Sequence, residues 1–161
     1  IADPMRRLLL AGLVAACALL AALLWHVLKR KRKTPLPLAP AQTQNLLDLA
    51  EADLHSLLAC GKPDRGEEKA FYVALSKIVK RILDAAYSIN ATERTTAEII
   101  DVLHDRREPN SETRKLIVNF LGCCDVVKFA KYIPVDTEHE AASQSAQQIL
   151  AEARKAVGIR E

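Results

Sequence analysis

The chain has 161 residues and a formal net charge of +3, enough for one modest domain with an additional segment. Seven of its 23 basic residues precede Thr34, so the remainder carries 16 basic against 19 acidic side chains. Because a nucleic-acid-binding protein needs a basic face to displace phosphate counterions, this composition argues against nucleic acid as a partner.

The first predicted element is a membrane-spanning helix over residues 8–28, LLLAGLVAACALLAALLWHVL. It carries no charge and has the length of about twenty residues that a helix needs to cross a bilayer. Five consecutive basic residues, 29–33, follow it, against two before it. By the positive-inside rule we expect a single-pass membrane protein, with residues 1–7 as an extracytoplasmic stub and the C-terminal side in the cytoplasm.

Two other interpretations of the N-terminal region stay open. Residues 14–17, Val-Ala-Ala-Cys, resemble the lipobox of a bacterial lipoprotein, which would be processed at Cys17 and exported. A cleaved secretory signal is the second interpretation. The apolar run continues beyond Cys17 as far as a block of basic residues, which favours the membrane anchor over both. The chain starts with Ile1 instead of Met, so we also expect sequence upstream of it.

A small cytoplasmic helical domain is predicted over residues 43–157, after a basic and proline-rich linker at 29–42. Its apolar residues recur at helical spacing and show no alternating strand pattern, which predicts an all-α bundle of five or six helices. We expect these helices at residues 42–60, 67–87, 95–105, 111–122, 122–132 and 137–157.

Several helix ends and core positions carry specific signals. Thr95 followed by Glu98 is a capping-box pattern. Ser111 is the expected N-cap of the next helix, and Gly122 is its expected stop. The residues predicted to face the core include Leu46, Leu47, Leu49, Leu54, Phe71, Leu75, Ile82, Ile99, Leu103, Ile117, Phe120, Val127 and Phe129.

The sequence contains no motif that indicates catalysis, a cofactor or a metal. It has neither a glycine-rich phosphate loop nor the ligand spacing of a zinc site. His55, His104 and His139 share no motif with a cysteine, and we expect them to be surface or half-buried residues. These observations predict a non-enzymatic protein without a small-molecule substrate.

Cys123 and Cys124 carry the alternative hypothesis, a thiol-based redox sensor or enzyme. Adjacent cysteines cannot form an ordinary strain-free disulfide, and a free cysteine usually behaves as a small buried hydrophobic residue. Lys128 lies one helical turn from Cys124, which leaves an activated thiol open. Asp125 and Lys128 have the spacing of an ordinary helix ion pair.

Three blocks in order, FYVALSKIVKRIL at 71–83, TTAEII at 95–100 and CDVVKFAKY at 124–132, resemble the cytoplasmic helical region of BatD-like aerotolerance (Bat) membrane proteins. The resemblance covers roughly residues 46–150. It implies a membrane protein that accompanies a MoxR-type AAA+ ATPase and von Willebrand factor A-domain proteins. The β-rich exported portion of that family is not present in this sequence. The resemblance supplies no catalytic residue.

We therefore predict that the helical domain mediates protein–protein interaction in an assembly for oxygen or stress tolerance. The candidate contact surface consists of residues on the second helix and on the CDVVKFAKY block. Its members are Tyr72, Ser76, Lys80, Arg81, Asp125, Lys128 and Lys131.

Overall fold

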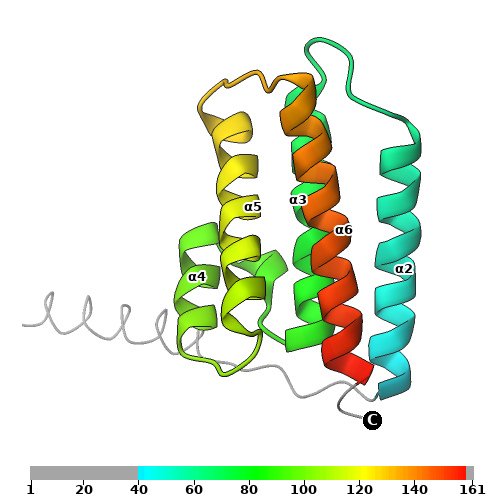
Figure 1. Cartoon of the computed structure of the whole chain (residues 1–161), viewed down its shortest axis with the longest axis vertical. Helices are drawn as coiled ribbons and strands as arrows, with labels where there is room; N and C mark the ends of the chain where they lie inside the picture. Colours follow the sequence, from blue (N-terminus) through cyan, green and yellow to red (C-terminus); the bar gives the residue numbers. More distant parts are fainter. Residues whose placement is uncertain (1–39, 159–161) are drawn as a thin grey trace, which may run out of the picture. The chain divides into compact units, whose positions relative to one another are not determined.

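The structure is a computed structural model that describes residues 40–158. This part is all-α, with five α-helices, one 3-10 turn and no strand between its first and last described residues. The elements are α2 (Pro40–Ala59), α3 (Glu68–Tyr87), η1 (Ala91–Glu93), α4 (Thr96–His104), α5 (Ser111–Phe129) and α6 (Asp136–Gly158) (Figure 1).

The predictions for the stub, the membrane helix, the lipobox cysteine and the basic run lie outside the described residues. Within residues 40–158, no helix is both long enough and apolar enough to cross a membrane.

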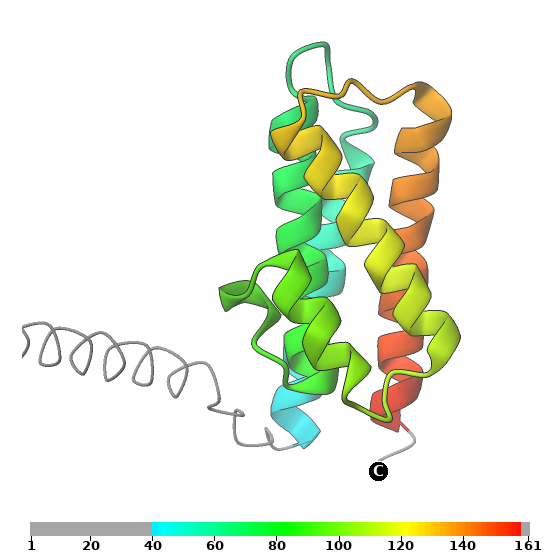
Figure 2. The same cartoon turned by 90° about the vertical axis from the view of Figure 1, so that its left-hand side faces the viewer.

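Helix α3 is the centre of the bundle. It packs against α2, α5, α6 and η1, while the short α4 packs against α5 (Figure 1). The view turned by 90° shows α5 inclined across the bundle, with α6 running along its length (Figure 2). Partners on several sides require apolar residues around most of α3, which is what its sequence provides. Its buried large apolar residues are Phe71, Tyr72, Leu75, Ile78, Val79, Ile82, Leu83 and Tyr87.

The connection from α3 to α4 is held by side chains that bond to the backbone. Ser88 adopts a left-handed conformation at the end of α3, and its N–H donates to the Asp84 carbonyl. The Asp84 carboxylate accepts hydrogen bonds from the Ala91 N–H, from the Thr92 N–H at 3.1 Å and from the Thr92 hydroxyl at 2.6 Å. These bonds satisfy polar groups at a turn where no helix supplies partners.

The predicted capping box at the start of α4 is confirmed. The Glu98 N–H donates to Thr95 Oγ1 at 3.3 Å, and the Thr95 N–H donates to Glu98 Oε2 at 3.0 Å. This reciprocal pair satisfies two backbone donors that a helix start otherwise leaves without partners.

Helix α2 begins at Pro40, two residues before the predicted start, because proline suits the first turn of a helix. Its buried stripe is narrow and contains Leu47, Ala50 and Leu54. The core assignment of Leu46 and Leu49 is wrong, since their side chains lie off this stripe and are exposed. Arg154 of α6 pairs with Asp48 of α2 at 2.7 Å and with Glu51 of the same helix.

The predicted break at Gly122 is also wrong, because α5 runs without interruption from Ser111 to Phe129. The buried residues Ile117, Phe120, Leu121, Cys124 and Val127 continue one helical stripe across the glycine. Burial of that stripe outweighs the cost of about 1 kcal/mol that an interior glycine imposes on a helix.

The N-cap of α5 is Asn110, not the predicted Ser111. The Asn110 side chain accepts a hydrogen bond from the Thr113 N–H at 2.8 Å. Asparagine is among the strongest N-cap residues, and the helix starts at Ser111, one residue earlier than a serine cap at that position would have implied.

Helix α6 starts at Asp136, one residue before the predicted Thr137. Glu138 reaches back and accepts the Val135 N–H at 2.9 Å, which fixes the start of the helix. The buried face of α6 is rich in alanine, and small side chains let a helix approach its neighbours closely. Its members are His139, Ala142, Ala146, Ile149, Leu150, Ala153 and Val157.

Replacing Gly122 by alanine is expected to stabilise the domain by about 0.5–1 kcal/mol, because alanine loses less conformational freedom in a helix. A Cβ atom at Gly122 meets no heavy atom within 4 Å. Gly61→Ala is the matched control, since Gly61 also faces open space but has a φ of +77° that strains alanine. Urea unfolding followed by circular dichroism measures both, and a lower midpoint for Gly122→Ala would contradict the uninterrupted helix.

Candidate functional site

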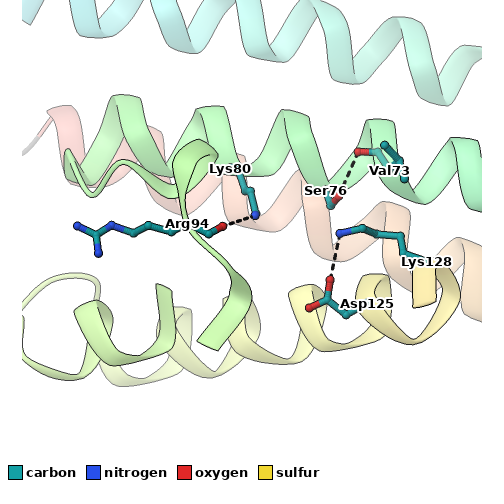
Figure 3. Close-up of polar contacts among 6 residues, drawn as sticks. All are labelled: Val73, Ser76, Lys80, Arg94, Asp125 and Lys128. Carbon is teal, nitrogen blue, oxygen red and sulfur yellow. Dashed lines mark hydrogen bonds and ion pairs between the residues drawn. The ribbon is translucent and has the colours of Figure 1, made fainter. Parts of the chain in front are cut away.

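Four of the predicted contact residues, Ser76, Lys80, Asp125 and Lys128, meet where α3 faces α5; we call this group the α3–α5 seam (Figure 3). Lys128 Nζ lies 3.0 Å from Asp125 Oδ1, which confirms the predicted ion pair. The Ser76 hydroxyl donates to the Val73 carbonyl at 3.0 Å, within its own helix. Lys80 Nζ donates to the Arg94 carbonyl at 2.7 Å and so ties the turn before α4 to α3.

Tyr72 and Ser76 do not belong to an outer surface, and their prediction as surface residues is wrong. Their side chains are only 1% and 4% exposed. Tyr72, Ser76 and Lys80 are spaced by four residues, so they share one face of α3. Helix α5 covers this face. The sequence alone could not show that this face was occupied.

Arg81 and Lys131 lie apart from the seam. Arg81 Nη1 is 2.6 Å from Asp53 Oδ2, an ion pair that joins α3 to α2. Lys131 follows the end of α5 and is exposed, with a φ of 55°. The seven predicted residues therefore do not form one patch.

Two cations, Lys80 and Lys128, interact electrostatically in the seam. Burial lowers the pKa of Lys80, and the charge of Lys128 lowers it further. Asp125, Asp84 and Glu98 oppose this shift. Because both lysines are already bonded to groups within the domain, the seam serves mainly to hold α3, α5 and the turn before α4 together.

The two adjacent cysteines have opposite environments. Cys124 is buried on the core side of α5, whereas Cys123 is exposed, and both are free thiols. Burial raises the pKa of the Cys124 thiol to about 12, and Lys128 only partly offsets this. A thiol with this pKa stays protonated at neutral pH, so Cys124 lacks the activation that a nucleophile or redox sensor requires.

His139 is not the surface or half-buried residue that was expected. It is buried, with its ring centroid 5.4 Å from that of Tyr72 and 6.1 Å from that of Phe71. Its Nδ1 atom is buried and has no hydrogen-bond partner. His139 sits one turn before Ala142 on the buried face of α6, which explains its position. Within the described part of the chain, no cluster of acidic, histidine or cysteine side chains could hold a metal ion.

The main feature that the sequence did not predict is a group of exposed apolar residues where α5 leads into α6. Val126, Phe129, Tyr132, Ile133 and Val135 are between 45% and 76% exposed, and we call them the apolar end patch. Phe129, predicted to lie in the core, is the most exposed of them. Lys128 Nζ lies 5.0 Å from the centre of its ring. The sequence did hold a signal for this patch, because the segment that connects α5 to α6 is unusually apolar, whereas connecting segments lie on the surface.

A cavity of about 330 Å³ adjoins this patch, between α3, α5 and α6. Its apolar walls are formed by Phe120, Val126, Val127, Pro134, Ala141 and Ala142. Tyr72 lines it from α3, and Tyr132 and Glu138 line it from the connection and the start of α6. The Tyr132 hydroxyl lies 2.9 Å from both carboxylate oxygens of Glu138, to which it donates.

No protein-family model, curated protein or solved structure matches this chain.

Alkylation of the cysteines is expected to separate them sharply. At pH 8 iodoacetamide should modify Cys60 and Cys123, which are exposed, while Cys124 reacts only after unfolding. With a pKa of about 12, roughly one Cys124 in ten thousand is a thiolate at this pH, and burial also blocks access. Peptide mass spectrometry measures each rate, and equal rates for Cys123 and Cys124 would contradict the packing of α5.

Proposed function

We propose that this chain is a non-enzymatic single-pass membrane protein whose helical domain binds other proteins. The observation that carries the proposal is the apolar end patch, five large apolar side chains within ten consecutive residues, each at least 45% exposed. Single exposed apolar residues are common, but grouped ones mark interaction surfaces on soluble domains. The adjoining cavity supports the same conclusion, since anchoring residues of interfaces fill such pockets.

The resemblance to the Bat proteins supplies the candidate partners, a MoxR-type AAA+ ATPase and von Willebrand factor A-domain proteins. The three blocks that carry the resemblance fall on α3, at the start of α4 and at the end of α5. The last block includes Phe129 and Tyr132 of the apolar end patch. We accordingly assign the domain to the cytoplasmic face of a bacterial inner membrane, in an assembly for oxygen or stress tolerance.

A charged residue at the edge of the patch would guide the encounter with a partner. Lys131 lies between Phe129 and Tyr132 and is exposed, whereas Asp125 and Lys128 pair with each other in the seam. Rim charges of this kind change association rates and salt dependence more than they change affinity. Arg81, on the side of α3 that faces α2, has no such position.

Removing the apolar anchors should weaken binding strongly. Phe129→Ser combined with Ile133→Ser is expected to reduce the affinity for the MoxR-type or A-domain partner by at least tenfold, because hot-spot side chains contribute about 2 kcal/mol or more. Leu49→Ser is the control, because Leu49 is an apolar residue of α2 that is 53% exposed and lies outside the patch. Calorimetric titration with purified partners gives the dissociation constants. Unchanged affinity with a normal circular dichroism spectrum would refute the patch as the contact surface.

Reversing a rim charge should act on the rate of association. Lys131→Glu is expected to slow association several-fold at low salt and to have little effect at high salt, where charges are screened. Arg81→Glu changes the net charge equally but lies on the α2 side, so it serves as the control. Biolayer interferometry at two salt concentrations measures both rates. A larger effect from Arg81→Glu would place the interface on the opposite side of α3.

A further inference from the structure

The cavity beside the apolar end patch has an unusual chemical lining. Of the twelve side chains around it, only Glu138 is charged, and none is basic. The Glu138 carboxylate accepts from the Tyr132 hydroxyl and from the Val135 N–H. A carboxylate has about four acceptor positions, so Glu138 retains room for a further donor. The lining therefore favours a group that donates a hydrogen bond and disfavours an anion.

Tyr72 supplies a second polar group to the cavity. Its side chain is 1% exposed, and its ring packs edge-on against Phe71 at 5.6 Å. Ionisation of Tyr72 is opposed by burial and then by Cys124, Glu138, Cys123 and Tyr132, three of which line the cavity. Tyr72 is itself one of the residues that line the cavity. A tyrosine hydroxyl can accept as well as donate a hydrogen bond, so Tyr72 offers an acceptor to a donor that enters the cavity.

The size of the cavity limits what can enter. Its volume of about 330 Å³ lies at the low end of the roughly 300–1,000 Å³ found for ligand pockets, which suits one bulky group. Val126 and Tyr132 belong both to the cavity wall and to the apolar end patch. A free small molecule would fill the cavity and leave Phe129 and Ile133 uncovered. A protein that covers the patch and inserts one side chain accounts for both features.

We propose that the cavity receives one large apolar side chain with a hydrogen-bond donor at its end, as in tryptophan, from the protein that covers the apolar end patch. This inference rests on the proposed protein-binding function. Tryptophan is a frequent interface anchor, and its indole N–H can donate to Tyr72 Oη or to Glu138. A lysine or arginine would have to lose its hydration among apolar walls, which costs far more than burying a neutral donor.

Three related probes test the lining without a known partner: indole, 1-methylindole, which lacks the N–H donor, and indole-3-acetate, which is anionic. Cys123 lines the cavity, so an occupant should slow its alkylation, while Cys60 lies elsewhere and serves as an internal control. On the full chain in lipid nanodiscs, indole is expected to slow Cys123 alkylation at least threefold and to leave Cys60 unchanged. 1-Methylindole and indole-3-acetate should need at least threefold higher concentrations than indole to slow Cys123 alkylation equally. Equal protection by either, or none by indole, would overturn the proposal.

Variants of the cavity lining test the Tyr72 hydroxyl and the occupancy of the cavity separately. Tyr72→Phe keeps the ring and removes the hydroxyl, so the preference for indole over 1-methylindole should shrink. A preference that survives in full would exclude a role for the hydroxyl. Ala141→Trp fills the mouth from an exposed position of α6, and Ala151→Trp, also exposed on α6 but not part of the lining, is the matched control. Indole should protect Cys123 in the second variant but not in the first.

Partner binding then distinguishes the two proposals. If Phe129→Ser with Ile133→Ser weakens the partner while Ala141→Trp does not, the patch binds without using the cavity, and this inference fails alone. If neither variant weakens the partner, the proposed function fails, even where indole still protects Cys123. The cavity proposal requires that Ala141→Trp weakens the partner and that Ala151→Trp does not.

Discussion

Helices α2, α5 and α6 all pack on α3, so the burial of α3 on several sides is the constraint on which the domain depends. Leu75, Val79, Ile82 and Leu83 have no measurable exposure, and each fully buried side chain of this kind contributes about 1.5–3 kcal/mol. The polar contacts organise the edges of this core. Asp84 holds the turn after α3, and Lys80 bonds to the backbone of Arg94.

The regular part of the fold could be predicted from the sequence because local signals and packing agree there. Helical periodicity predicted α3 almost to the residue, and the Thr95 capping box predicted the start of α4. Prediction failed where packing overruled a local signal. Glycine indicates a helix end, yet the buried stripe of α5 continues through Gly122. Local signals also could not show that Tyr72 is covered and Phe129 is not, because that depends on where distant helices lie.

The candidate site in the structure differs from the predicted one for the same reason. Residues chosen for their charge on α3 proved to be internal ties, with Lys80 bonded to a carbonyl and Arg81 paired to α2. The exposed apolar groups gather instead at the end of the bundle, where α5 ends and the chain turns into α6. Cys123 opens onto the cavity there, and Cys124, next to it in sequence, belongs to the core. The reactivity of Cys123 thus depends on the cavity, and that of Cys124 depends on the core.

Glu138 joins three tasks in one carboxylate: it receives the N–H that starts α6, fixes the Tyr132 hydroxyl and lines the cavity. A donor that entered the cavity and bonded to Glu138 would join those two contacts on the same carboxylate. The first turn of α6 and the segment before it are therefore mechanically coupled to the cavity. The helix that packs against α2, α3 and α5 therefore begins at a wall of the cavity.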